Sequence, residues 1–241
     1  MSTTRMLDDY ASPTPYADIQ ERMEKTWRQG EHICLIGPTG CGKTTLAREL
    51  LPIRRYVVAF AVKREDDSLE ELGWPIIRNW PPTRNHERMI LWPKIDTQES
   101  FQNQHEVFKR ALWEMFSAGR WTIYADDLKY LSGVLKLDQP IRAIAEQGRS
   151  AKLTLVSCVQ RPSRVPVEVY TDVGHLFVWR PGDGRDMKRL MEIAGAGPID
   201  VREMLHRSRN MEEHGFLYVD VHSGVMLETI LDDSSSLAST G

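Results

Sequence analysis

The chain has 241 residues, 41% of them hydrophobic, and its 31 lysines and arginines are opposed by 34 aspartates and glutamates. This length is enough for one α/β domain with a full core but too short for two large domains. The net charge of −3 provides no overall attraction to nucleic acid, so any grip on a polymer must be local. No run is long and apolar enough to cross a bilayer, and the first residues lack the apolar core of a signal peptide. We therefore expect a cytoplasmic protein without a membrane partner.

The beginning of the chain predicts an arm followed by a helix and two strands. Residues 1–16 are polar and punctuated by proline, which favours a flexible N-terminal arm, and a helical pattern runs from 17 to 28. The apolar run 32–36 is typical of a buried parallel strand, and the β-rich run 56–62 predicts the second strand. We expect residues 17–231 to form a single domain.

The middle of the chain departs from this regular alternation. Residues 73–94 contain four prolines and three tryptophans, which favours an irregular excursion packed by its own aromatic side chains, with a possible strand at 89–92. Apolar residues then recur at helical spacing between 97 and 118, with Asp96 or Thr97 as the N-cap.

Three more strands and a hairpin are predicted in the second half. The strands cover 121–125, 153–159 and 175–179, the hairpin lies within 215–230, and residues 232–241 form a polar tail that we expect to be disordered. Strands that alternate with helices predict a mostly parallel sheet covered by helices on both faces.

The segment directly after the first strand matches the pattern G-x-x-x-x-G-K-[ST] of phosphate-binding loops. In such loops, backbone N–H groups surround the phosphates, the lysine reaches the β and γ phosphates, and the hydroxyl residue holds Mg²⁺. The helix that follows points its positive N-terminal end at the same anion. The sequence thus predicts a site for ATP and Mg²⁺, with Lys43 as a catalytic cation and Thr44 at the metal. The predicted nucleotide-binding residues are Gly37, Pro38, Thr39, Gly40, Cys41, Gly42, Lys43, Thr44 and Thr45.

Polar residues follow two of the later strands. The hydrolysis of ATP needs a carboxylate that binds the metal and a group that orients the attacking water, and the ends of strands beside the phosphate loop are the places where such groups are expected. Asp126 and Asp127 follow the strand 121–125, and we assign Asp126 to Mg²⁺ and Asp127 to the attacking water. The alternative is that this pair of acids caps the next helix. Gln160 ends the strand 153–159, where its amide could reach the γ phosphate or the water.

The segment from Gly148 to Pro162 resembles FtsK/HerA-type motor ATPases. A Gly-Arg pair, a strand and Gln-Arg-Pro occur there, after the phosphate loop and the acidic pair, in the order that this family has; the match runs from about His32 to Trp179. The resemblance implies a RecA-like P-loop NTPase fold, a sensor role for Gln160, and an arginine at position 149 that completes the active site of a neighbouring subunit. Arg161 and Arg180 are alternative candidates for that arginine. It also implies a homo-oligomeric ring, a hexamer or a pentamer, that pumps DNA in cell division, conjugation or viral genome packaging.

Two features depart from that family. Its members usually have Asp-Glu where this chain has Asp126-Asp127, so the second carboxylate has a shorter reach toward water. Larger members also carry additional DNA-reading or membrane domains, for which this chain has no room.

We therefore expect an ATP-hydrolysing motor that moves nucleic acid, in the host cytoplasm if it is viral. Residues 131–137 are a candidate pore loop, with Lys129 and Lys136 as candidate contacts to the phosphates of nucleic acid. Two alternatives stay open. One is a small-molecule kinase that uses Arg202, Arg207 and Arg209 as a lid, and the other is a scaffold whose assembly depends on ATP. A GTP switch is less consistent with the sequence, which contains no Asn-Lys-x-Asp motif.

Overall fold

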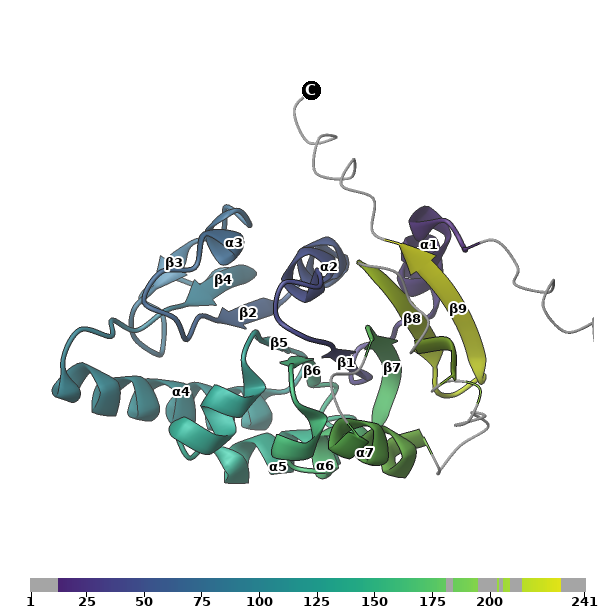
Figure 1. Ribbon diagram of the computed structural model, residues 1–241. Helices are drawn as coiled ribbons and strands as arrows, with labels where there is room; N and C mark the ends of the chain where they lie inside the picture. Colours follow the sequence, from purple (N-terminus) through teal and green to yellow (C-terminus); the bar gives the residue numbers. More distant parts are fainter. Residues whose placement is uncertain (1–12, 181–183, 195–202, 204–205, 209–213, 231–241) are drawn as a thin grey trace, which may run out of the picture.

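A nine-stranded sheet runs through the molecule in the order β3-β4-β2-β5-β6-β1-β7-β8-β9 (Figure 1). The computed structural model describes residues 13–180, 184–194, 203, 206–208 and 214–230. The strands are β1 (His32–Ile36), β2 (Val57–Phe60), β3 (Ile76–Ile77), β4 (Arg88–Leu91), β5 (Thr122–Ala125), β6 (Thr154–Val159), β7 (Val173–Val178), β8 (Gly215–Asp220) and β9 (Val225–Ile230).

The strands from β3 to β7 pair in parallel, whereas β8 is antiparallel to β7 and β9 is antiparallel to β8. This arrangement confirms the predicted fold class and the C-terminal hairpin. Because β1 lies between β6 and β7, the loop that follows β1 leaves the sheet near its middle, where the carboxyl ends of neighbouring strands surround it.

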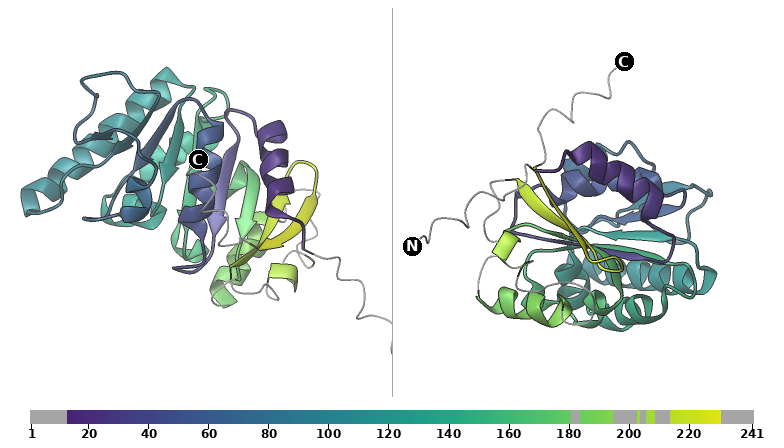
Figure 2. Two further views of the ribbon diagram at one scale, coloured as in Figure 1. Left: turned by 90° about the horizontal axis from the view of Figure 1, so that it is seen from above. Right: turned by 90° about the vertical axis from the view of Figure 1, so that its right-hand side faces the viewer.

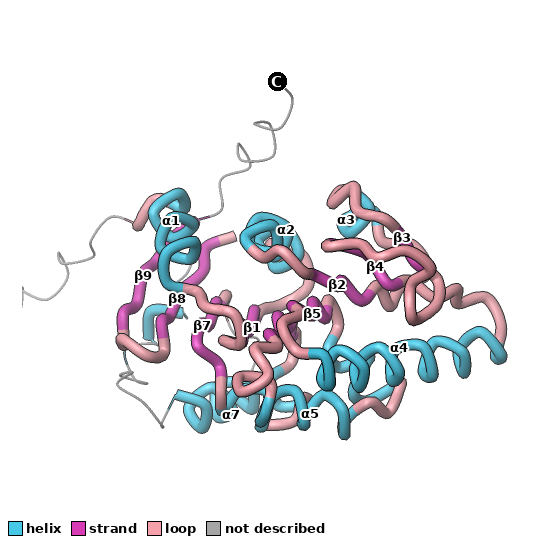
Figure 3. The backbone as a smooth tube through the Cα atoms, turned by 180° about the vertical axis from the view of Figure 1, so that it is seen from behind, coloured by secondary structure: helices cyan, strands magenta, loops and turns pink. Residues whose placement is uncertain are grey.

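Helices cover both faces of the sheet, as Figures 1 and 2 show, and the tube in Figure 3 gives the same two layers from behind. The helices α1, α2 and α3 lie on one face, and α4, α5, α6 and α7 lie on the other. Their bounds are α1 (Tyr16–Thr26), α2 (Lys43–Leu50), α3 (Asp67–Glu70), α4 (Gln98–Ala118), α5 (Asp138–Gln147), α6 (Glu168–Thr171) and α7 (Gly184–Ala194).

Each layer has its own apolar core, because the central strands are buried on both sides. Every residue of β1 is buried, as expected for a central parallel strand. On the face of α4, Phe60 stacks on Phe108 with ring centroids 4.6 Å apart. On the opposite face, Leu46 of α2 and Trp27 pack in a second cluster with Trp179. The phosphate loop is thus built between two close-packed layers.

The helix α4 has the predicted N-cap. Thr97 Oγ1 accepts the backbone N–H of Ser100 at 3.1 Å, and Ser100 Oγ accepts that of Thr97 at 2.9 Å, which completes a capping box.

The excursion at 73–94 contains more regular structure than its prolines indicate, since it adds both β4 and the short edge strand β3 to the sheet. The excursion also packs on α4, because Trp80 Nε1 donates to Glu114 at 2.7 Å.

The end of the predicted N-terminal arm is ordered against the C-terminal strand, so the arm is shorter than predicted. The helix α1 begins at Tyr16, the last residue of the predicted arm, and the N–H of Thr14 donates to the carbonyl of Glu228 in β9 at 2.6 Å. Residues 1–12 and the predicted tail 232–241 lie outside the described residues. Within the described part of the chain, no helix is long and apolar enough to span a bilayer.

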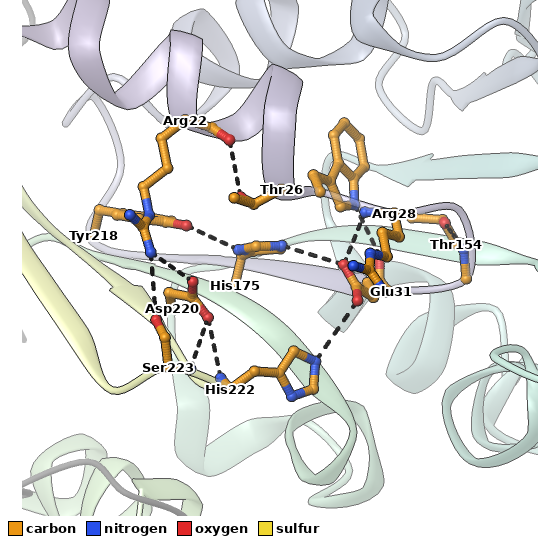
Figure 4. A network of polar contacts seen from close by, with 12 residues as sticks. Arg22, Thr26, Arg28, Glu31, Thr154, His175, Tyr218, Asp220, His222 and Ser223 are labelled. Atoms are coloured by element: carbon orange, nitrogen blue, oxygen red, sulfur yellow. Dashed lines mark hydrogen bonds and ion pairs between the residues drawn. The ribbon is translucent and has the colours of Figure 1, made fainter.

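A polar network at the amino ends of β1 and β7 joins α1 to the antiparallel end of the sheet (Figure 4). Arg22 of α1 donates to Asp220 of β8 at 2.9 Å, and His175 of β7 lies 3.0 Å from the hydroxyl of Tyr218 and 3.5 Å from Glu31. Burial tends to raise the pKa of Asp220, but the hydrogen bonds from Ser223 and Arg22 outweigh it and hold that pKa below its usual value. The network stabilises the amino ends of β1 and β7, which lie at the opposite end of the strands from the phosphate loop.

Candidate nucleotide-binding site

The phosphate loop has a backbone that requires glycine. Gly42 caps α2 in the left-handed conformation with φ of 100°, which glycine adopts without strain. A Cβ at Gly37 would lie 2.7 Å from Cβ of Trp179 and 2.8 Å from Sγ of Cys41. The loop therefore closes tightly on the neighbouring strand β7, as the motif predicts.

Lys43 is folded over this loop. Only 7% of it is exposed, and its Nζ donates to the carbonyls of Gly37 at 2.8 Å and Pro38 at 2.6 Å. The ammonium thus lies inside the curve of the loop, at the N-terminal end of α2, where both the cation and the helix dipole favour an anion. The arrangement is chemically suited to a polyphosphate.

Thr44 and Asp126 form the second part of the site. The Thr44 hydroxyl donates to Asp126 Oδ1 at 2.9 Å, and the hydroxyl of the buried Tyr124 donates to the same oxygen at 2.7 Å. Hydroxyl and carboxylate oxygens suit Mg²⁺, which commonly takes one or two protein ligands beside substrate phosphates. In the described part of the chain, no group of three or more acidic, histidine or cysteine side chains could hold a metal alone. The residues present therefore fit a metal that is held jointly with a nucleotide.

Lys63, which the sequence analysis did not single out, also contacts Asp126. Its Nζ lies 2.7 Å from Asp126 Oδ2 and 3.0 Å from Asp66 Oδ2. Burial alone would raise the pKa of Asp126, but hydrogen bonds from Lys63, Tyr124 and Thr44 lower it below the ordinary value. Burial likewise disfavours the Lys63 ammonium, yet the two carboxylates raise its pKa. Asp126 is thus an anion that is hydrogen-bonded on both oxygens.

One carboxylate oxygen of Asp127 caps the helical turn that follows β5. Its Oδ1 accepts the backbone N–H of Tyr130 at 3.0 Å, at the start of a π-helical turn, Tyr130–Val134. This contact matches the capping alternative for one oxygen of the side chain, and the role in orienting water stays a prediction. The candidate pore loop therefore begins as a helical turn, with Lys129 exposed and Lys136 at a φ of 56°.

Gln160 lies beside the phosphate loop, as its place at the end of β6 predicts. It is exposed, and it borders a pocket of about 270 Å³. Arg161, an alternative candidate for the arginine that completes a neighbour's site, forms an ion pair of 3.2 Å with the buried Asp186 of α7. The pocket beside Gln160 is lined by Ile36, Gly37, Pro38, Thr39, Gln160, Arg161, Pro162 and Asp186.

Arg149 is exposed and lies at the amino ends of the parallel strands, whereas the phosphate loop lies at their carboxyl ends. It follows α5 and precedes β6, whereas Gln160 follows β6, so the strand separates the two residues. The six residues of β6 span about 20 Å. Arg149 therefore cannot reach the phosphate loop of its own chain.

The fold is that of P-loop NTPases, with the phosphate loop between β1 and α2 and a strand-end aspartate on β5. No protein-family model matches the chain, and no curated protein sequence does. Solved structures do match it at low identity, so they establish the fold alone.

One is the genome packaging NTPase B204 from Sulfolobus turreted icosahedral virus 2 in complex with AMPPCP. It has a TM-score of 0.60 and 14% identity, with 84% of this chain and 98% of that chain covered. Another is VirB4 of Thermoanaerobacter pseudethanolicus, with a TM-score of 0.61, 10% identity, and 86% of this chain and 90% of that chain covered. The cytoplasmic domain of the Thermomonospora curvata Type VII secretion ATPase EccC has a TM-score of 0.54 and 14% identity, with 86% of this chain and 27% of that chain covered. The likeness to FtsK/HerA-type ATPases is confirmed at the level of the fold.

Proposed function

We propose that this protein is an ATPase that hydrolyses ATP with Mg²⁺ and, as a ring of identical subunits, translocates DNA, as in the packaging of a viral or plasmid genome. The observation that carries the proposal is the contact between Thr44 of the phosphate loop and Asp126, directly after β5, because it joins the two groups that hold a nucleotide-bound metal. The structural likeness to a genome packaging NTPase and to VirB4 supports this choice.

In this proposal the chain's own residues divide the work. Lys43 and the loop amides bind the phosphates, Thr44 and Asp126 hold Mg²⁺, and Asp127 and Gln160 orient the attacking water. Magnesium, when bound, neutralises charge that develops on the phosphates. Arg149 serves the site of the adjacent subunit, which its exposure at the far edge of the sheet allows.

The small-molecule kinase is less well supported. Of the three arginines considered for its lid, Arg202 and Arg209 lie outside the described residues, and Arg207 donates to Glu228 of β9 at 2.5 Å. Since β9 is the outermost strand and β1 lies three positions away in the sheet order, this contact favours a structural role for Arg207.

The decisive experiment measures ATP hydrolysis against protein concentration, with and without DNA, in parallel with the size of the ATP-bound species. The rate per subunit should rise as subunits assemble, and DNA should raise it further. Arg149→Ala should lower turnover by roughly 10³-fold, because an arginine supplied in trans contributes that much to phosphoryl transfer. ATP affinity should stay within about threefold of wild type.

Arg84→Ala, which removes another exposed arginine, is the matched control and should keep the wild-type rate. A rate per subunit that is independent of concentration and of DNA would exclude the ring motor. Assembly that depends on ATP without measurable hydrolysis would indicate the scaffold instead. Phosphate transfer to a small acceptor that outpaces hydrolysis would indicate a kinase.

A further inference from the structure

Lys63 is placed at Asp126 by the pairing of two strands. Phe60, the last residue of β2, is in register with Ala125, the last residue of β5, so the two chains leave the sheet side by side. Three residues beyond Phe60, the carbonyl of Lys63 accepts the indole N–H of Trp92 at 2.7 Å. The backbone of Lys63 is therefore held in place, while half of its side chain is exposed.

The ammonium of Lys63 bridges two carboxylates that are almost completely buried. It lies 2.7 Å from Asp126 and 3.0 Å from Asp66, whose side chains are 4% and 3% exposed. Asp66 is oriented from its other oxygen, which accepts the hydroxyl of Ser68 at 2.5 Å. One cation and two anions leave this group with a net charge of −1, so it can accept further positive charge.

We propose that Lys63 competes with Mg²⁺ for Asp126 and, when a magnesium nucleotide binds, releases Asp126 and keeps Asp66 as its partner. The inference rests on the proposed nucleotide site and deepens it, because it assigns a regulating residue to the metal. Lys63 thereby sets the concentration of Mg²⁺ at which the site loads.

Simple electrostatics supports the exchange. An ammonium in contact with Asp126 would lie within a few ångströms of a metal that Thr44 and Asp126 share, and like charges at that distance repel strongly when water is partly excluded. Release would be costly if it left the ammonium without a partner, but Asp66 already binds it. Because Asp66 remains as a partner, the release of Asp126 by Lys63 costs little free energy.

The test measures the binding of a fluorescent ATP analogue to the full chain while Mg²⁺ is titrated, and records the Mg²⁺ concentration at half-maximal binding. Lys63→Met should lower this midpoint by roughly three- to tenfold, as expected for the loss of one competing charge at a partly screened site. Asp66→Asn should raise the midpoint, because Lys63 then has Asp126 as its remaining anionic partner. Lys94→Met, which removes an exposed lysine, is the control and should leave the midpoint unchanged.

Opposite shifts in the two variants are the signature of competition, since a merely structural role would shift both in the same direction. If Lys63→Met does not fold, Asp66→Asn together with Lys63→Arg decides the matter: the arginine variant should stay near wild type while the asparagine variant shifts upward. Unchanged midpoints, or shifts of the same sign, would overturn the inference. Failure of the wild-type chain to bind the analogue at any Mg²⁺ concentration would instead refute the proposed function.

Discussion

Replacing Tyr124 with phenylalanine tests whether the Asp126 carboxylate is held by a buried hydrogen bond. Tyr124 is fully buried, and its hydroxyl donates to Asp126 Oδ1 at 2.7 Å and lies 3.3 Å from Sγ of Cys158. A hydrogen bond to a charged group contributes about 1.5–3 kcal/mol net, and no water can replace a donor at this buried position without a cavity. Tyr124→Phe should therefore lower the free energy of unfolding by about 2 kcal/mol, or the melting temperature by roughly 4–8 °C for a chain of this size.

The assay is urea unfolding of the nucleotide-free protein, combined with a double-mutant cycle against Asp126→Asn. The cycle should give a coupling energy of about 1 kcal/mol or more, because the charge strengthens the bond. Tyr130→Phe is the matched control: its hydroxyl donates to the neutral Gln104 at 3.0 Å and should contribute about 1 kcal/mol or less. A loss for Tyr124→Phe no larger than that of the control, with coupling below about 0.5 kcal/mol, would refute the argument.

Three further changes test other parts of the molecule. Gly37→Ala should abolish tight binding of an ATP analogue in equilibrium titrations and lower stability by about 1–3 kcal/mol, because the new Cβ overlaps Trp179 at 2.7 Å. Asp127→Asn should keep ATP affinity but lower hydrolysis by roughly 10²-fold in steady-state assays, because an amide cannot accept a proton from water. Asp220→Asn should lower stability by about 1–2 kcal/mol at neutral pH, whereas Glu21→Gln, an exposed partner in an i,i+4 pair, should change it by less than about 0.5 kcal/mol. The folded-state pKa of Asp220 is lowered, so its contribution is complete above the unfolded pKa of about 3.9 and should disappear from denaturation curves as the pH falls through the folded value.

The strands and the phosphate loop could be predicted from the sequence because short, local sequence patterns define them. Each central strand is a short apolar run, and Gly37, Gly42, Lys43 and Thr44 form a motif in which every residue has its own physical reason. The contact between Thr44 and Asp126 also follows from the sequence, since the carboxyl ends of parallel strands meet at one edge of the sheet.

Features that depend on tertiary packing were not accessible in this way. Lys63 lies in a loop without any motif, and its importance arises from the register of β2 beside β5. The strand β3 has two residues in a proline-rich segment, so no periodicity could identify it. The capping of Tyr130 by Asp127 was foreseen only as an alternative, because an acid after a strand can serve either purpose. Lys63 is also the first of five consecutive charged residues, 63–67, so the sequence does not distinguish it from its neighbours.

The separation of Arg149 from the phosphate loop constrains how copies of this chain can assemble. The candidate nucleotide site lies at the carboxyl edge of the sheet and Arg149 at the amino edge, about 20 Å apart along β6. If Arg149 completes a neighbour's site, the amino edge of one subunit must face the carboxyl edge of the next. A head-to-tail repeat of this contact generates a closed ring or an open filament, whereas a symmetric dimer satisfies it only where one face of the subunit carries both edges. In a ring every site receives an arginine, whereas any open assembly leaves one site incomplete, so turnover per subunit should reach its maximum only when the ring closes.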